Sequence, residues 1–567
     1  MNKSLFRTKN IDRILADGTD GAHGGNSLKR VLTVKDLTFF GIAAILGAGS
    51  FSSLGGAIFS GGPGVIILFV ITGIACAFTA FCYSDFASRI PVAGSAYTYA
   101  YASFGELFAW IIGWALIMEY SIGNIYVAYS WSDYFTSFLD KMHIHIPAYL
   151  CTSYMEAKHA IESHTSNEEL LSAWDNAPVF AGIKCILDLP ALIINVLITY
   201  LVFKGVKESK NFSNLMVILK LGVVLLIILV GGYLVLNNHL TYNWLPKNNE
   251  GIASFMPNGF GGVMSAVAGV FFAYIGFDAV SVLAEESKNP QRDLPRGMIY
   301  SLVICTVIYI LLTLILTGAV HYQKFEGVGD PLAFIFEEQN LNVGWMQLLV
   351  SICAVIAMTS VLLVFQMGQP RIWMSMSRDG LLPGVFQKIH PKFKTPSFST
   401  IVTGLVVGVP ILFTDKTFVL DFTSIATLFA FVLVCGGVLF LPRTIKQAGK
   451  FHLPYINSKF IFPLIILSAI ATISVAFNNY FPSLFEFSGN SAAVTYNVSA
   501  IIFWVISLSL SIGAFIKNWS LIPLLGLTTC LYLLTGMTAM NWAWFGAWLT
   551  IGLIIYFQYG YKKSKLA

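Results

Sequence analysis

Long apolar stretches, separated by shorter polar segments, recur along nearly the whole chain. Each stretch contains about 20 apolar residues, the length of helix that crosses roughly 30 Å of hydrocarbon. Segments of about ten residues with alternating polarity, which β-barrel spans require, are missing, so the spans are predicted to be helices. The fourteen predicted spans are centred near residues 47, 74, 120, 195, 225, 270, 308, 355, 405, 430, 468, 505, 528 and 551. This pattern predicts an all-α polytopic membrane protein.

Composition and charge agree with that class. Of the 567 residues, 56% are hydrophobic and 11% are charged, which leaves more apolar surface than a water-soluble core can bury. Lys and Arg collect in cytoplasmic loops, and most of the 34 do so when the polar N-terminal tail, residues 1–35, lies inside. We therefore predict a multi-pass protein of the plasma (inner) membrane with both termini in the cytoplasm. The net charge of +5 then follows from topology and does not indicate nucleic-acid binding.

Residues 138–187 form one long polar excursion, which the predicted topology places outside the cell between the third and fourth spans. The segment "TSNEELLSAWD" within it predicts a helix capped by Thr165 or Ser166. The excursion also contains His143, His145, His159 and His164. Because no cysteine or carboxylate completes a metal-ligand spacing, a solvated helical lid is favoured over a metal site. Cys151 and Cys185 share the excursion and either form a disulfide or stay reduced.

Glycine clusters interrupt two spans at corresponding positions. Span 1 reads "FFGIAAILGAGSFSSLGGAIF", with Gly47 and Gly49 near its middle, and span 6 reads "VAGVFFAYIGFDAVSVLAEE", with Gly276. Glycine weakens a helix interior by about 1 kcal/mol relative to alanine, so the backbone can unwind at these places. Two breaks five spans apart fit an inverted repeat of five plus five helices with a binding site at the breaks. Close packing of small residues is the alternative explanation.

Unwound helix ends have a chemistry of their own. Free N–H groups at one helix end attract anions, and free carbonyl groups at the other end attract cations. A zwitterion, which carries both charges a few ångströms apart, fits between two such breaks. The broken-helix interpretation therefore favours amino acids as ligands.

Three ionisable side chains fall within or beside predicted spans. Lys220 interrupts the apolar run 214–235, Glu119 lies in the middle of span 3, and Asp278 follows the span-6 glycine. A charge near the bilayer centre costs roughly 2.5–3.5 kcal/mol, so each residue is a functional-site candidate. For Lys220 the alternative is that its long stem carries the ammonium toward water. For Glu119 the alternative is that a neutral carboxyl group forms a hydrogen bond that holds helices together.

Several long segments closely resemble one family of transporters. Three of them are "FFAYIGFDAVSVLAEESKNPQRDLPRGM" (271–298), "AMTSVLLVFQMGQPRIWMSMSRDGLLPGVFQKIHPKFKTPSFSTI" (357–401) and "GVKESKNFSNLMVILKL" (205–221). In these segments the chain is similar to the cationic amino acid transporter family of the amino acid, polyamine and organocation superfamily. The resemblance covers most of residues 35–445 and the last two spans. The excursion and an extra helix pair near residues 458–516 lie outside the usual bacterial pattern of that family.

The resemblance implies a fold and a set of binding residues. The implied fold is the ten-helix, five-plus-five inverted-repeat core of LeuT-like transporters over residues 36–445, followed by four additional helices over residues 446–567. The substrate carboxylate would meet N–H groups of the span-1 break, and the ammonium would meet carbonyl groups of the span-6 break. The implied substrate-binding residues are Ala48, Gly49, Ser50, Phe272, Ala273, Ile275 and Glu119. The Ser50 hydroxyl either donates to the carboxylate or satisfies an unwound carbonyl group.

The resemblance also implies coupling and gating residues. Lys220 matches a span-5 lysine that stands where sodium-coupled relatives of this fold hold a cation, so it is the implied coupling residue. A desolvated lysine can release its proton near neutral pH and thus alternate between ammonium and amine. Phe272 or Tyr274 is a candidate aromatic gate, with core packing as the alternative, and Asp278 is a further gating candidate. The motifs around residues 285–295 and 368–383 are predicted to form an inner gate through Glu285, Arg292, Arg371 and Arg378, or a static clasp.

We thus predict a secondary active transporter that moves amino acids by alternating access, as proton-coupled import. An amino acid exchanger, or a transporter-like sensor without proton coupling, is the alternative. An enzyme is not expected, because the sequence has no HExxH helix or nucleotide-binding loop. The expected partners are an amino acid, protons and the lipid bilayer, with no nucleic acid, cofactor or metal; a small membrane-protein partner stays open. Whether the substrate is cationic or neutral also stays open.

Overall fold

The computed structural model describes residues 7–9, 32–47, 49–90, 95–163, 167–180, 182–205, 210–247, 251–281, 287–393, 395–440, 451–476, 478–487 and 491–565. Helices make up nearly all of the regular structure in these ranges, and the strands there are two short ones, β1 (Val179–Phe180) and β2 (Ile183–Lys184), paired antiparallel. Eight helices in the described part are long and apolar enough to cross a membrane, and four more are apolar but shorter. The predicted all-α class is confirmed, whereas the count of fourteen spans stays a prediction.

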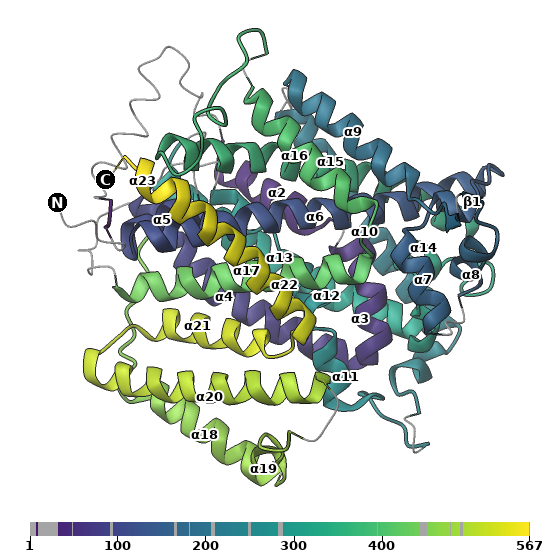
Figure 1. The fold of residues 1–567 in the computed structure, drawn as a ribbon. Helices are drawn as coiled ribbons and strands as arrows, with labels where there is room; N and C mark the ends of the chain where they lie inside the picture. Colours follow the sequence, from purple (N-terminus) through teal and green to yellow (C-terminus); the bar gives the residue numbers. More distant parts are fainter. Residues whose placement is uncertain are drawn as a thin grey trace.

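The long helices lie roughly alongside one another between two ends of the molecule (Figure 1). They are α4 (Val65–Arg89), α6 (Glu106–Lys141), α10 (Lys210–Asn237), α13 (Pro290–Ala319), α15 (Gly344–Arg378), α17 (Lys416–Phe440), α20 (Ser491–Lys517) and α22 (Ala539–Ile555). The shorter apolar helices are α9 (Leu189–Lys204), α16 (Ser397–Ile411), α18 (Ile461–Ala476) and α21 (Leu521–Leu534). Inside this bundle α15 packs along α6, and α13 packs along α4.

Side-chain caps and prolines set where several helices begin. Asp188 precedes α9 and accepts a hydrogen bond from the Ala191 N–H at 3.0 Å, and Pro190 occupies the first turn, where no N–H is needed. Thr538 precedes α22 and accepts from the Asn541 N–H at 3.3 Å. These caps satisfy N–H groups that the helices themselves leave without partners.

The first predicted span is interrupted. Helix α2 (Val34–Ile45) ends at the Leu46–Gly47 step, a π-helical turn follows over Gly49–Ser53, and α3 (Leu54–Gly61) continues beyond it. The N–H groups of Ser50 and Phe51 both point to the Gly47 carbonyl, at 3.1 and 3.2 Å. The glycine-rich segment therefore unwinds as predicted.

The sixth predicted span is interrupted as well. It comprises α11 (Gly259–Ser265), α12 (Val267–Phe272), turns over residues 273–277 and a short 3₁₀ turn over residues 278–281. Gly276 adopts a φ of +118°, a conformation that side-chain-bearing residues disfavour. A Cβ atom on Gly276 would also lie 2.9 Å from the carbonyl carbon of Ala44, and one on Gly49 would collide with the backbone of Ala273. The glycines thus both unwind the helices and allow the two breaks to touch.

The two ends of the bundle carry different segments, which we call the loop side and the tail side (Figure 1). The loop side holds the excursion between α6 and α9, with α7 (Tyr154–Glu162), α8 (Glu168–Asp175) and the β1–β2 hairpin. The tail side holds residues 7–9 and α23 (Tyr561–Lys563). The predicted caps of α8, Thr165 and Ser166, lie outside the described residues, and Asn167 Oδ1 accepts from the Leu170 N–H at 3.3 Å.

The predicted lid is helical, as expected, and its cysteines stay reduced. Cys151 and Cys185 are not joined by a disulfide. Within the described ranges no three His, Cys, Asp or Glu side chains gather as a metal site would require. His159 of α7 contacts Asp415 at 3.7 Å and Asn167 Nδ2 lies 3.4 Å from the Gly327 carbonyl, so the excursion rests on the loop-side ends of the bundle at two points.

Helices α18 and α20 lie at one edge of the molecule and share a small apolar core with α21 (Figure 1). That core is separate from the main one and consists of Phe462, Ile466, Ala514, Leu521 and Leu524. Leu464 and Ile516 on these helices are each 69% exposed, as side chains that face lipid would be. The extra helix pair therefore packs beside the main bundle and touches its core through Leu510 of α20.

Replacing Gly276 by alanine should destabilise the protein by about 1–3 kcal/mol, because the added methyl group must displace the Ala44 backbone. The melting temperature of the purified protein in detergent measures the effect. Gly222→Ala in α10 is the matched control, since a Cβ atom there meets nothing within 4 Å and alanine favours a helix. Equal melting temperatures for the two variants would contradict the contact between the breaks.

Candidate functional site

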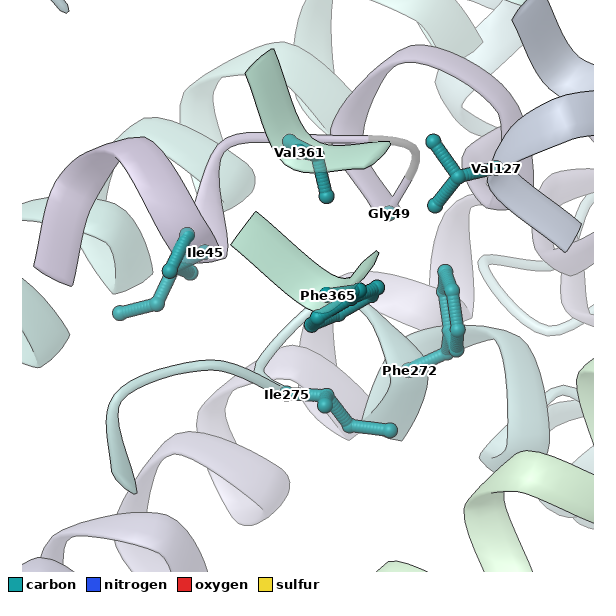
Figure 2. Close-up of a pocket in the computed structure, with 8 residues that line it drawn as sticks. Ile45, Gly49, Val127, Phe272, Ile275, Val361 and Phe365 are labelled. Atoms are coloured by element: carbon teal, nitrogen blue, oxygen red, sulfur yellow. The ribbon is translucent and has the colours of Figure 1, made fainter. Parts of the chain in front are cut away.

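A small cavity lies between the two breaks. Its walls come from α2 and the turn that follows, from α6, from the end of α12 and from α15 (Figure 2). The lining residues are Ala44, Ile45, Gly49, Val127, Phe272, Ile275, Val361 and Phe365. The cavity volume of about 10 Å³ corresponds to room for about one water molecule. Every lining side chain is apolar, so any polar recognition in the cavity has to come from the backbone.

Serine side chains satisfy the backbone of the span-1 break. Ser50 is fully buried, and its hydroxyl donates to the Gly47 carbonyl at 3.0 Å. In this structure the hydroxyl therefore satisfies an unwound carbonyl group, which is one of the two roles predicted for it. The Ser53 hydroxyl lies 2.7 Å from the Gly49 carbonyl and 2.9 Å from the Gly269 carbonyl, so it also ties the first break to α12. Ala48 lies outside the described residues.

A tyrosine hydroxyl connects the two breaks. Tyr309 Oη, from α13, lies 2.7 Å from the Ile45 carbonyl at the end of α2 and 2.7 Å from the Ala273 carbonyl just after α12. Buried carbonyl groups at unwound helix ends need donors, and these two carbonyl groups share the one hydroxyl proton of Tyr309. Tyr309 was not predicted from the sequence, because it stands in an ordinary apolar run that reads as plain packing.

Aromatic pairs close the cavity on both sides. Toward the loop side, the Tyr126 ring on α6 meets the Phe272 ring at a centroid distance of 4.6 Å. Toward the tail side, the Tyr120 ring on α6 meets the Phe365 ring on α15 at 5.6 Å. Both contacts have edge-to-face geometry, which aromatic quadrupoles favour.

An ion pair lies beyond the loop-side aromatic contact. Lys416 at the start of α17 pairs with Asp133 on α6, and its ammonium lies 5.6 Å from the centroid of the Tyr126 ring. The same ammonium is 3.5 Å from the Gly329 carbonyl, which also accepts from the Ser52 hydroxyl at 3.0 Å. This cluster joins α6, α17 and the span-1 break on the loop side of the cavity, and no sequence pattern predicted that these residues meet.

Lys220 occupies a second polar position beside the first break. Its ammonium on α10 lies 2.8 Å from the Ser360 hydroxyl of α15 and 3.5 Å from the Ala43 carbonyl of α2. The residue is only 2% exposed. The ammonium therefore lies among three helices inside the bundle, and the alternative in which the stem extends to water is not adopted in this structure.

The remaining predicted site residues lie outside the cavity lining. Tyr274 is buried and donates to the Phe69 carbonyl of α4 at 2.8 Å, which is a packing role. Glu119 is buried beside the Thr427 hydroxyl of α17 and interacts electrostatically with Asp278. Asp278 is buried with its carboxylate against backbone N–H groups of the second break. These three residues lie behind the cavity walls.

The hydroxyl of Tyr129, on α6, lies 2.8 Å from both the Ile411 and the Thr414 carbonyls. It therefore ties α6 to the end of α16. Of the charges predicted to form an inner gate, Glu285 lies outside the described residues.

Comparison with known proteins gives concordant matches. The family model described as amino acid permease matches residues 32–499, and a second model, described as the C-terminus of AA_permease, matches residues 521–564. The branched-chain amino acid permease BcaP of Bacillus subtilis is 37% identical over 100% of both chains. The methylthioribose transporter of Bacillus subtilis is 35% identical over 99% of both chains. The vacuolar cationic amino acid transporter 4 of Arabidopsis thaliana is 34% identical over 77% of this chain and 67% of its own.

Tyr309→Phe should loosen both breaks at once, because the two carbonyl groups lose the one hydroxyl that they share, at a total cost of about 1–3 kcal/mol. Hydrogen–deuterium exchange should rise around both breaks. Tyr129→Phe is the matched control, since it removes a similarly buried hydroxyl whose acceptors, the Ile411 and Thr414 carbonyls, lie at the end of α16 and away from both breaks. The bridging role of Tyr309 would be contradicted if both variants changed exchange at the breaks equally.

Proposed function

The chain belongs to the amino acid permease family, and we propose that it moves amino acids across the membrane by alternating access through the cavity between the two breaks. The observation that carries this proposal is the contact of two unwound helix segments across one cavity. Unwound segments offer backbone N–H groups to a carboxylate and carbonyl groups to an ammonium. The apolar walls of the cavity leave the backbone as the source of polar contacts.

In the proposed complex the substrate carboxylate faces Ala48, Gly49 and Ser50, and the ammonium faces the carbonyl groups of Phe272, Ala273 and Ile275. The present hydrogen bonds set a condition on binding. The Ser50 N–H already points to Gly47, and the Ala273 carbonyl already accepts from Tyr309. A cavity of about 10 Å³ also has to widen before an amino acid enters. Substrate binding thus requires the breaks to move.

The proposed transporter has the ten-helix inverted-repeat core over residues 36–445 and four additional helices over residues 446–567. Fourteen spans are supported by the two parts of Val34–Arg89, the other seven long helices, the four shorter apolar helices and the interrupted helix α11–α12. In this topology the tail side faces the cytoplasm and the loop side faces outward from the plasma membrane. The orientation rests on the distribution of basic residues.

Two barriers are proposed to open in turn. The outer barrier consists of the Tyr126–Phe272 contact and the Asp133–Lys416 ion pair. The inner barrier begins at the Tyr120–Phe365 contact. Phe272 is thus the proposed aromatic gate. Tyr274 holds the second break against α4, and Asp278 binds backbone N–H groups of the same break, so both act in gating from behind Phe272. Glu119 holds α6 against α17.

The apolar lining favours a neutral substrate with an apolar side chain. A guanidinium or ammonium on the substrate side chain would need a buried counter-ion, and neither Glu119 nor Asp278 lines the cavity. Among the relatives, BcaP is named as a branched-chain amino acid permease. Its name agrees with a cavity lined by Val127, Val361 and Phe365.

A ligand panel tests this proposal. L-leucine, L-isoleucine and L-valine should raise the melting temperature of the purified protein, because a ligand present at 100 times its Kd stabilises the folded state by about 2.7 kcal/mol. L-arginine and L-lysine should leave the melting temperature unchanged. Stabilisation by the cationic pair alone would reverse the substrate class. If no amino acid stabilises the protein or accumulates in proteoliposomes, the transport proposal fails; binding without accumulation would indicate a sensor.

Lys220 is the proposed coupling residue, since its ammonium joins α10 to the first break and to α15. Loss of its proton would weaken those contacts and let the break move, because a neutral amine gives up the charge assistance of its hydrogen bonds. Proton uptake and release at Lys220 would then accompany substrate movement.

Lys220→Met should abolish L-leucine uptake driven by a proton gradient in proteoliposomes while L-leucine exchange continues. Lys204→Met, at the exposed end of α9, is the control and should transport normally. Unchanged uphill uptake by Lys220→Met would contradict the coupling role. If the unmodified protein exchanges L-leucine but never accumulates it against a gradient, the chain is an exchanger.

A further inference from the structure

Glu106, the first residue of α6 on the tail side, is fully buried and has an unusually complete set of donors. The Arg7 guanidinium binds both carboxylate oxygens, with Nε 2.9 Å from Oε2 and Nη2 2.8 Å from Oε1. The hydroxyl groups of Tyr101 and Tyr556 each donate to it at 3.0 Å, and the Ser564 hydroxyl donates as well. A buried carboxylate is stable only with such partners.

These donors come from both tails of the chain. Arg7 belongs to the N-terminal tail, whereas Tyr556 and Ser564 lie at and beyond the end of α22, on either side of α23. The tails also touch each other, because Arg7 Nη2 lies 3.4 Å from the Tyr561 carbonyl and its guanidinium lies 5.5 Å from the centroid of the Tyr561 ring. The Glu106 N–H donates to the Arg7 carbonyl at 3.0 Å, which adds a backbone contact.

A second carboxylate repeats the arrangement on α15. Asp379 follows that helix directly and accepts from the Lys9 ammonium at 3.0 Å and from the Tyr97 hydroxyl at 2.7 Å. Its carbonyl accepts from the Lys565 N–H at 3.1 Å. Each tail therefore binds both α6, at Glu106, and the end of α15, at Asp379 or beside it.

The helices joined in this way are the ones that line the cavity. Helix α6 contributes Val127, and α15 contributes Val361 and Phe365. Their tail-side ends have to move for the cavity to open toward the tails. We propose that the two tails form a latch on Glu106 and Asp379 that holds the tail side closed, and that Glu106 is a positioning residue for transport. This inference rests on the proposed transport function.

The chemistry of the latch favours opening in one step. If Arg7 left alone, Glu106 would remain as a buried charge without its main partner, so release of one tail favours release of the other. The pKa of Arg7 is raised, mainly because its guanidinium donates to Glu106, so the guanidinium stays charged. Opening of the latch then depends on conformational strain transmitted from the cavity.

A double-mutant cycle tests whether the tails act as one unit. Arg7→Ala and Ser564→Ala should each increase hydrogen–deuterium exchange over residues 95–106 and 379–390, measured in the full chain without substrate. The double variant should exceed the larger single effect only slightly, because both residues act through Glu106. Lys562→Ala, an exposed lysine on α23, is the matched control and should leave exchange unchanged. Additive effects, or exchange as low as in the control, would overturn the latch.

Transport measurements separate a latch from a purely structural contact. With L-leucine as the probe, the latch variants should keep the affinity of the unmodified protein and change the uptake rate several-fold, and Arg7→Lys should restore part of the normal rate. Affinity and rate lost in parallel, with no rescue by Arg7→Lys, would overturn the positioning role. If the unmodified protein takes up no amino acid, the transport proposal fails, and the exchange data still decide whether the tails act as one unit.

Discussion

Backbone polar groups inside a membrane have to be satisfied, and this constraint governs the centre of the molecule. Two helices unwind in the middle of the bundle, which would leave carbonyl groups without donors where no water is available. The protein meets this cost with short-range hydroxyl donors from Ser50, Ser53 and Tyr309. Gly49 and Gly276 then let the two unwound segments come close enough to share those donors. Without this arrangement the breaks would be too costly to keep.

Polar and apolar functions are separated in space around the breaks. The cavity walls carry apolar side chains, whereas the buried ionisable groups lie one layer further out, with Lys220 on one side and Glu119 and Asp278 on another. Such a division lets the walls select a side chain by shape while charge acts on the helices that carry those walls.

The sequence was informative about helices and their interruptions. Hydropathy located the helical segments, and glycine clusters located the breaks near Gly47 and Gly276. At Gly276 the φ of +118° is one that favours glycine. Charged residues such as Lys220 also stood out, because a charge is costly in an apolar environment and therefore rare there. Phe272 and Ile275 were also named in advance, through family resemblance, and both line the cavity.

The walls and the bridging groups were not predictable in the same way. Val361 and Phe365 belong to a helix that is apolar on most of its faces, so no periodicity marks the side that meets the cavity. Tyr309 and the partners of Glu106 depend on contacts between segments far apart in the chain. Tyr274 was named as a gate because it is aromatic and adjacent to the break, but in this structure its hydroxyl turns away toward α4.

The small size of the cavity has a consequence for leakage. Protons and small ions cross a bilayer most readily along continuous files of hydrogen-bonded water, and an apolar constriction interrupts such a file by drying out. A chamber with room for about one water molecule between two aromatic contacts cannot hold such a file. The apolar walls therefore prevent ions from leaking down the electrochemical gradient while both aromatic contacts are in place.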